Sequence, residues 1–302
     1  MIDWSGLLDF IGFYLIPGLV TGCIYALGAI GVSLLFGILR FAHFAHGDVM
    51  TLGGYLALTV VWWLGWPVLA AIPFAAAATA LVAVGLDRAF YKPFRRRPTI
   101  ISVIASFGVM LMLRSAIQLI WGVEPMQYKA GIEPPLVFFD ELRVQPRHIW
   151  MVGVTAALVL ALHILLTRTR IGRAMRAVSD EPDLARVTGI STERVILVTW
   201  LLGGALAAIA GIFLGMDTKI DSYMGWDMLL PVFAAAILGG IGSPMGAAAG
   251  GLVLGLIEEL STYNWIGDDP LVSPDYKLGI AFAIMVALLI WRPTGLLRGR
   301  QF

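Results

Sequence analysis

The sequence predicts an all-α, polytopic integral membrane protein that forms a single domain over residues 1–302. Of its residues 59% are hydrophobic and only 14% are charged, and the mean hydropathy is +0.85. Soluble domains carry about 25% charged residues. Apolar runs recur from Phe10 almost to the C-terminus, and one helix needs about 20 apolar residues to cross a hydrocarbon core of roughly 30 Å. These features argue against a soluble domain.

Nine membrane crossings are predicted from these runs, with eight to ten as the range. An odd number follows if the acidic N-terminus lies outside and the basic C-terminal tail inside. The pair flanking Gly239 to Gly246 is short and rich in glycine, so two re-entrant halves are the alternative there. The helices are placed near residues 10–37, 49–65, 68–88, 100–121, 149–167, 195–216, 228–241, 245–260 and 277–291.

Three basic clusters predict the orientation, because Lys and Arg in short loops are retained on the cytoplasmic side. We expect these clusters and the C-terminus in the cytoplasm, and the N-terminus outside. Residues 122–148 mix both signs of charge with several prolines, which predicts a loop on the outside. The clusters are Arg88, Lys92, Arg95, Arg96 and Arg97; Arg168, Arg170, Arg173, Arg176, Arg186 and Arg194; and Arg292, Arg298 and Arg300.

Two segments interrupt the apolar pattern at membrane depth, and broken helices are where transporters place their pathways. Broken or re-entrant helices are therefore predicted near 40–54, around RFAHFAHGD, and near 238–250, around LGGIGSPMG. Small residues follow both segments, which hints at a distant internal duplication. The predicted pathway residues are His43, Phe44, His46, Gly47, Asp48, Gly239, Gly240, Gly242, Ser243 and Pro244.

Charged and histidine side chains within these runs have competing interpretations. His43 and His46 could hold a metal ion, but no cysteine is nearby, and hydrogen bonds within a broken helix are favoured. Asp48 is expected to cap the following helix, with a role in the pathway as the alternative. An unpaired Arg114 would cost about 2.5 to 3.5 kcal/mol at membrane depth, so it should face protein, water or a carboxylate. Glu258 and Glu259 are expected to be solvated near the outer face or to contact a binding protein.

The cytoplasmic segment 168–194 is predicted to form a short helix on the membrane surface that docks on a partner. Pro182 suits the first turn of that helix, and Asp180 could cap it. A basic loop that only sets the topology is the alternative. The predicted coupling residues are Gly172, Arg173, Ala174, Arg176, Ala177, Asp180, Ala185, Gly189 and Ile190.

Three sequence blocks together resemble the branched-chain amino acid ABC permeases of the LivH type. They are GLVTGCIYALGAIGVSLLFGILR with HFAHGD after it, GRAMRAVSDEPDLARVTGI, and AILGGIGSPMGAAAGGLVLGLIE. One departure is His43, where the family usually has Asn or Ser. The resemblance implies an inner-membrane permease subunit that pairs with a second, related permease. It also implies two cytoplasmic ATPases and a periplasmic solute-binding protein.

The resemblance implies amino acids as the solute, branched-chain ones first, with urea, amides or small carboxylates as alternatives. The chain has no Gly-Lys pair, so it lacks a phosphate-binding loop, and ATP and Mg²⁺ are expected on the ATPase partners. No cofactor or nucleic acid is expected in this chain.

A secondary transporter would ordinarily need coupling carboxylates at the midplane, and these are scarce here. An intramembrane enzyme would need a nucleophile with its base, or a metal set, and the sequence shows neither. A membrane scaffold is the remaining alternative.

Overall fold

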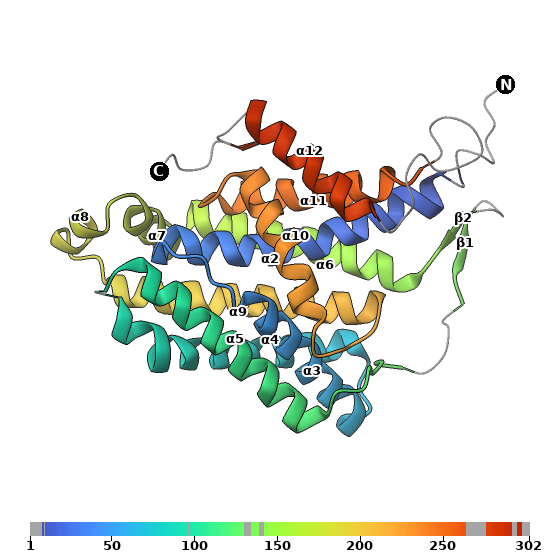
Figure 1. Ribbon diagram of the computed structural model, residues 1–302, viewed down its shortest axis with the longest axis horizontal. Coiled ribbons are helices and arrows are strands. Elements are labelled where there is room, and N and C mark those ends of the chain that lie inside the picture. Colours follow the sequence, from blue (N-terminus) through green and yellow to red (C-terminus); the bar gives the residue numbers. More distant parts are fainter. Residues whose placement is uncertain are drawn as a thin grey trace.

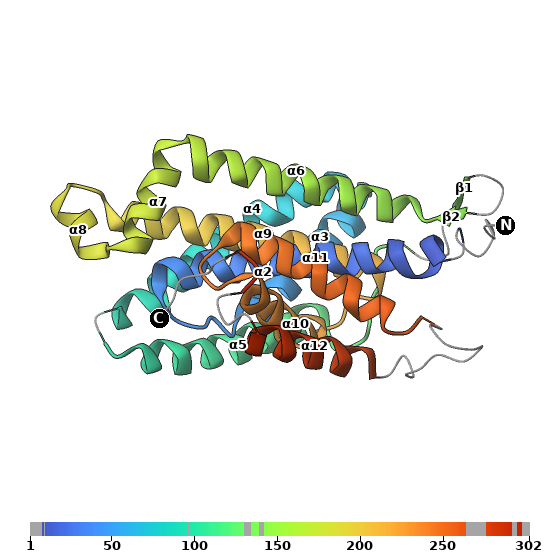
Figure 2. The same ribbon diagram turned by 90° about the horizontal axis from the view of Figure 1, so that it is seen from above.

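A computed structural model describes residues 8, 10–95, 97–129, 134–138, 142–263, 276–291 and 295–297. The all-α architecture is confirmed, with one short antiparallel strand pair at one end of an elongated bundle (Figures 1 and 2). Two short helices, α7 and α8, form the opposite end. The elements are η1 (Ile11–Leu15), α2 (Ile16–Leu39), α3 (His46–Leu64), α4 (Val68–Leu86), η2 (Asp87–Tyr91), η3 (Lys92–Phe94), α5 (Thr99–Trp121), β1 (Leu136–Phe138), β2 (Leu142–Val144), α6 (Pro146–Arg168), α7 (Arg170–Asp180), α8 (Pro182–Val187), α9 (Thr192–Asp217), α10 (Met224–Gly239), α11 (Pro244–Leu260) and α12 (Lys277–Trp291).

Within the described residues, six helical segments are long and apolar enough to cross a membrane. Helices α10 and α11 bend by 119° at their junction and can count together as a seventh. The apolar part of α12, Leu278–Trp291, is shorter than these segments. The predicted helix positions are therefore confirmed, but nine full crossings are not. The sharp bend agrees with the re-entrant alternative for residues 228–260.

Helix α2 lies at the centre of the bundle and packs along α11 through glycine. A Cβ atom at Gly251 would overlap the backbone of Ala26, and one at Gly255 would overlap the backbone of Gly22. Small residues let two helix backbones approach closely in a membrane protein. The contact continues to Gly18, which faces Leu256. This backbone-to-backbone seam explains why the sequence carries its small-residue run after Pro244.

A second set of close approaches joins α3 to α9 and α10. A Cβ atom at Gly211 would overlap the backbone of Met50, and one at Gly53 would overlap Ala208. The first turns of α3 and α10 meet where Gly47 faces Gly225. These contacts fix the start of α3 against two other helices.

The break between α2 and α3 covers residues 40–45, within the predicted region. Arg40 ends α2 in the left-handed conformation with φ 57° and is the only described non-glycine residue with positive φ. The chain then turns back, with the amide of His46 bonded to the carbonyl of His43 at 3.1 Å. The ring of His46 reaches the carbonyl of Gly28, about 16 Å along α2 from its last residue. Helix α3 therefore begins near the middle of a hydrocarbon core of roughly 30 Å.

The break between α10 and α11 covers residues 240–243 and is stabilised from two sides. Gly240 and Gly242 take positive φ values of 107° and 81°. The hydroxyl of Ser243 caps α11 by accepting the amide of Gly246 at 3.2 Å. The amides of Leu296 and Leu297 donate to the carbonyls of Leu238 and Gly239, at 2.8 and 3.2 Å. The segment after α12 therefore caps the last turn of α10.

The segment after α5 is tied to the end of the bundle that carries the strand pair. Met126 and Ile220 form an antiparallel bridge. Burial raises the pKa of the Tyr128 phenol, so it stays protonated and donates to the carbonyl of Gly54 at 3.1 Å. The loop predicted over 122–148 thus begins with an ordered anchor. Its Glu133, Asp140 and Glu141 lie outside the described residues, as do Arg96, Arg292, Arg298 and Arg300 of the basic clusters.

We expect Gly251→Val to destabilise the protein, because its side chain would overlap the α2 backbone. Overpacking costs typically about 1–3 kcal/mol, and a backbone cannot move aside as a side chain can, so the loss should reach at least about 3 kcal/mol. The measurement is the thermal unfolding midpoint of purified protein in detergent. Gly153→Val in α6 is the matched control, since nothing lies within 4 Å of its added Cβ. Equal midpoints for the two variants would contradict the seam.

Candidate translocation site

Both histidines of the first break form hydrogen bonds inside the protein, as predicted. His43 and His46 are each 1% exposed. Nε2 of His46 donates to the carbonyl of Gly28 at 3.1 Å, and Nε2 of His43 lies 2.9 Å from the hydroxyl oxygen of Tyr91. Gly31 makes room for the ring of His46, because a Cβ atom there would touch its Cε1 at 2.7 Å. The histidines hold the break in place.

His43 also lies in an aromatic cluster formed by three elements. Its ring meets Trp200 of α9 edge-on at 5.0 Å, and Trp200 stacks on Tyr91 at 5.2 Å. Phe44, the next residue of the break, stacks on Phe107 of α5 at 4.4 Å. The described residues contain no group of three or more His, Cys, Asp or Glu that could hold a metal ion.

Asp48 forms an ion pair with Arg114, so its predicted role as a helix cap is wrong. Nε and Nη2 of Arg114 each lie 3.0 Å from one carboxylate oxygen of Asp48. The helix begins after Ala45, which makes no side-chain cap. Asp48 is in the first turn of α3, where the positive end of the helix dipole also favours a carboxylate. Of the three predicted environments for Arg114, which were protein, water and a carboxylate, the structure shows the carboxylate.

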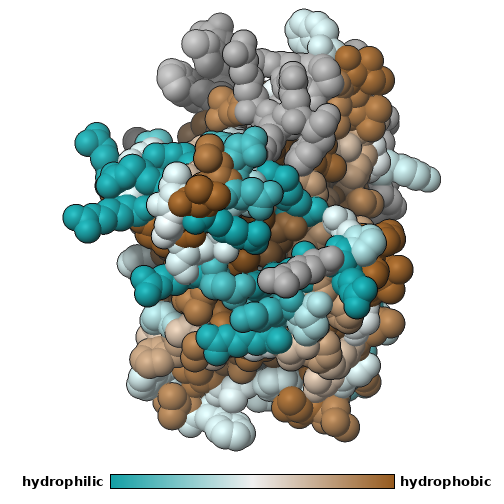
Figure 3. Space-filling view, turned by 90° about the vertical axis from the view of Figure 1, so that its left-hand side faces the viewer, coloured by the Kyte–Doolittle hydropathy of each residue, from teal (hydrophilic) through white to brown (hydrophobic). Residues whose placement is uncertain are grey.

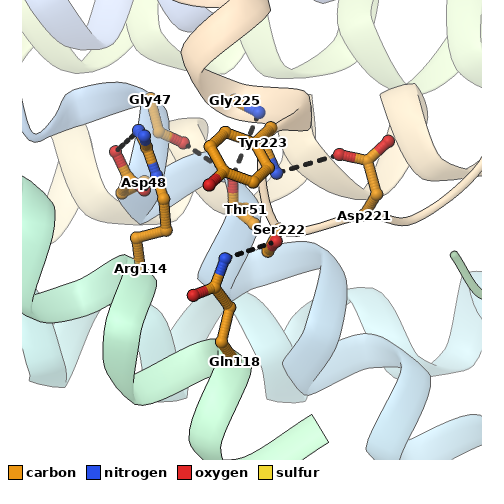
Figure 4. Close-up of polar contacts among 9 residues, drawn as sticks. All are labelled: Gly47, Asp48, Thr51, Arg114, Gln118, Asp221, Ser222, Tyr223 and Gly225. Carbon is orange, nitrogen blue, oxygen red and sulfur yellow. Dashed lines mark hydrogen bonds and ion pairs between the residues drawn. The ribbon is translucent and has the colours of Figure 1, made fainter. Parts of the chain in front are cut away.

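Aromatic and polar side chains from the start of α10 surround this ion pair (Figure 4). The guanidinium carbon of Arg114 lies 4.9 Å from the ring centre of Tyr223 and 5.2 Å from that of Trp226. One turn further along α5, the amide of Gln118 donates to the hydroxyl of Ser222 at 3.0 Å. This arrangement joins α3, α5 and α10 at membrane depth.

Thr51 links α3 directly to the first turn of α10. Its hydroxyl donates to the carbonyl of Gly47 at 3.2 Å and accepts the amide of Gly225 at 3.1 Å. Sequence reasoning missed Thr51, Ser222, Tyr223 and Trp226. The one available signal was a cluster of polar and aromatic residues, DSYMGWD, directly before an apolar run.

The predicted pathway residues form two groups rather than one. Those from His43 to Asp48 lie at the level of Gly28 on α2, whereas the second break lies near Gly37, about 13 Å further along that helix. At Gly37 three elements converge: the backbone of Gly242 is close to it, and the hydroxyl of Ser179 in α7 donates to its carbonyl at 3.0 Å. Helix α7 therefore contacts α2 beside the second break.

The predicted single helix in segment 168–194 is two helices, α7 and α8. Asp180 ends α7 instead of capping α8, whose first helical residue is Pro182 after Glu181. The hydroxyl of Thr169 caps α7 by accepting the amide of Gly172 at 3.1 Å. Of the predicted coupling residues, those from Gly172 to Asp180 lie on α7, Ala185 is buried on α8, and Gly189 and Ile190 follow α8.

The end of the bundle formed by α7 and α8 is hydrophilic with apolar side chains exposed among the polar ones (Figure 3). Leu184 is 62% exposed and Val187 is 85% exposed, both on α8. A cavity of about 340 Å³ lies behind α7, against α2, α6 and the second break. Its lining includes Arg176, whose guanidinium also donates to the carbonyl of Leu166. This end of the bundle thus presents a surface of polar and apolar side chains, with a cavity behind it.

Glu258 is buried within the bundle, contrary to the expectation that it is solvated. Its residue is 5% exposed, and the hydroxyl of Tyr25 donates to its carboxylate at 2.7 Å. The contact joins α11 to α2 alongside their glycine seam. The apolar run ends in two adjacent acids, Glu258 and Glu259. The sequence alone does not show whether either carboxylate is buried or faces the loop.

The sequence pattern of a family described as "Branched-chain amino acid transport system / permease component" matches residues 14–289. The chain belongs to this family. It is 34% identical to the high-affinity branched-chain amino acid transport system permease protein LivH of Escherichia coli K12, with 93% of each chain covered. It is 32% identical to BraD of Pseudomonas aeruginosa, a permease protein described in the same words, with 94% of each covered.

Two weaker matches, one of sequence and one of fold, extend the comparison. The ribose import permease protein RbsC of Escherichia coli K12 is 25% identical over 88% of this chain and 81% of its own length. A chain in the structure of PsaBC from Streptococcus pneumoniae in complex with Fab has a TM-score of 0.50 and 15% identity, covering 96% of this chain and 95% of its own. These matches and the apolar helices identify a multi-pass membrane protein and a permease component.

Removing one partner of the Asp48–Arg114 pair should leave a buried charge uncompensated. We expect Asp48→Ala or Arg114→Ala to lower the free energy of unfolding by about 3–5 kcal/mol. Asp48→Asn combined with Arg114→Gln removes both charges and keeps hydrogen-bonding groups, so it should recover more than half of that loss. The measurement is thermal unfolding of the single and double variants. A double variant as unstable as the sum of the two singles would refute the pairing.

Proposed function

We propose that this protein is the membrane-spanning permease subunit of an ATP-binding cassette importer for amino acids, branched-chain ones first. The observation that carries the proposal is the family match over residues 14–289. The two breaks in membrane-spanning helices support it, because transport pathways are built from discontinuous helices. LivH and BraD, named for branched-chain amino acid transport, support the solute class. Urea, amides and small carboxylates are the competing solutes.

The proposed attachment point for the ATPases is the surface formed by α7 and α8. Exposed Leu184 and Val187 would fit an apolar groove on one ATPase, and the arginines around them would contact the rim of that groove. Movement of α7 would reach the second break through the bond from Ser179 to Gly37. ATP and Mg²⁺ would be bound by the ATPases alone. Opening and closing would then follow from rocking of the helices.

The remaining partners follow from the same proposal. A second, related permease would complete the pathway, and a solute-binding protein would deliver the amino acid from the periplasm. The protein would reside in the bacterial inner membrane, with α7 and α8 in the cytoplasm. Residues 122–148 would then lie on the periplasmic side with the N-terminus. Basic residues near α7 support this orientation, since Lys and Arg are retained on the cytoplasmic side.

We expect Val187→Glu to abolish coupling, because it places a charge in an apolar contact with the ATPase. ATP-driven leucine uptake into proteoliposomes that contain the complete transporter should fall at least about tenfold, equivalent to about 1.4 kcal/mol. Val123→Glu is the matched control. Val123 is 64% exposed in the loop after α5, at the other end of the bundle. Unchanged uptake with Val187→Glu would exclude this surface as the coupling site.

The orientation can be tested with single cysteines. Cys23 is buried and is the only cysteine of the chain, so Cys23→Ala provides a background without thiols. In intact spheroplasts, a membrane-impermeant maleimide should label Glu124→Cys but not Asp183→Cys. Both should be labelled after permeabilisation, because both positions are exposed. The reverse pattern would place α7 and α8 outside.

A further inference from the structure

One face of the bundle carries polar side chains at membrane depth, and another carries none. The exposed positions of α4 from Pro73 to Gly85 have only apolar side chains or none, as expected of a surface against lipid. By contrast, α5 exposes Ser115, and the start of α10 with the residue before it exposes Tyr223, Trp226 and Asp227. Both helices lie on the same side of the bundle, away from α6 (Figure 2).

Asp227 lies in the first turn of α10 and is exposed, although that turn begins near the middle of the membrane. The depth follows from the contact of Gly225 with Gly47, beside the level of Gly28. A carboxylate facing lipid there would cost about 2.5 to 3.5 kcal/mol. Asp227 must therefore face water or another protein, so the surface around Asp227 does not meet lipid tails.

Arg114 retains hydrogen-bonding capacity toward the same face. A guanidinium has five N–H donors, and the two contacts with Asp48 use two of them. No other hydrogen bond of Arg114 to a described residue occurs in the structure. The side chain is 11% exposed, and the half-exposed rings of Tyr223 and Trp226 flank it. Trp226, whose ring centre lies 5.2 Å from the guanidinium carbon, immediately precedes Asp227 in the chain.

We propose that Arg114, Tyr223, Trp226 and Asp227 form a transient binding site for a zwitterionic α-amino acid in the translocation pathway. The inference rests on the proposed transport function and adds the residues that recognise the solute. The α-carboxylate binds the unused N–H groups of Arg114. The ammonium group binds Asp227 and the face of Trp226, since aromatic rings attract cations. The aliphatic side chain of the solute contacts the rings.

The charges of this site select among the competing solutes. Asp48 neutralises Arg114, and Lys219 in the preceding loop pairs with Asp221 at 3.7 Å. Asp227 therefore leaves the site with one net negative charge. A small carboxylate has no ammonium group to pair with Asp227, so the negative charge of the site disfavours its binding. Urea and simple amides have neither the carboxylate that Arg114 binds best nor the ammonium group that Asp227 binds best.

The test uses proteoliposomes with the complete transporter and leucine-loaded binding protein at saturation, and it measures leucine uptake, ATP hydrolysis and copurification of the subunits. We expect Asp227→Asn to reduce uptake about tenfold while ATP hydrolysis and assembly stay near the wild-type level. Asp227→Glu, which keeps the charge, should restore at least half of the uptake. Glu124→Gln, an exposed carboxylate in the loop after α5, is the control and should change nothing.

The double variant Asp48→Asn with Arg114→Gln separates recognition from structural support. If the site binds solute, this variant assembles and hydrolyses ATP but takes up little leucine. Restored uptake in the double variant, wild-type uptake with Asp227→Asn, or loss of subunit copurification with Asp227→Asn would each overturn the site. If the wild-type transporter takes up no leucine, the proposed solute is wrong, and the proposed site for it is wrong as well.

Discussion

The structure depends on close contact between helix backbones at glycine. Along α2 and α11, and again between α3, α9 and α10, a single added Cβ atom would overlap a neighbouring backbone. Helices in lipid gain little from burying apolar side chains against each other, so van der Waals contact and short-range polar contacts must hold them. Close approach of the helices provides the van der Waals contact and allows the polar contacts to form. Only because α10 comes so near α3 can Thr51 accept the amide of Gly225.

The close approach of the helices also explains how polar groups are stabilised inside the membrane. Each break leaves main-chain groups without helical partners, and these groups need partners where water is absent. In the first break the amide of Phe44 donates to the hydroxyl of Ser106, and in the second break Ser243 and the residues after α12 bind the exposed ends. Asp48 and Arg114 satisfy each other in the same way. The polar residues are thus arranged around defects in the helices.

Much of the fold followed from apolar run length, because a helix that crosses a membrane has few alternatives. The breaks were also predictable, since glycine and proline interrupt such runs. Contacts between distant segments were not. Nothing in the sequence near Asp48 points to Arg114, 66 residues away, and the helix-capping prediction failed because the ion pair is a tertiary contact. The prediction that Glu258 is solvated was wrong for the same reason, because its partner Tyr25 lies on another helix. The aromatic partners of Arg114 were missed because Tyr223 and Trp226 both lie before residue 228, where the predicted helix begins.

The bonds from Leu296 and Leu297 to the last turn of α10 have a mechanical consequence. Trp291 ends α12, and four residues later Gly295 already lies against Gly240. Such a link spans at most about 14 Å, so the end of α12 cannot withdraw from the break. Any movement of the second break relative to the rest of the bundle must therefore carry the end of α12 with it, unless the bonds from Leu296 and Leu297 are broken first.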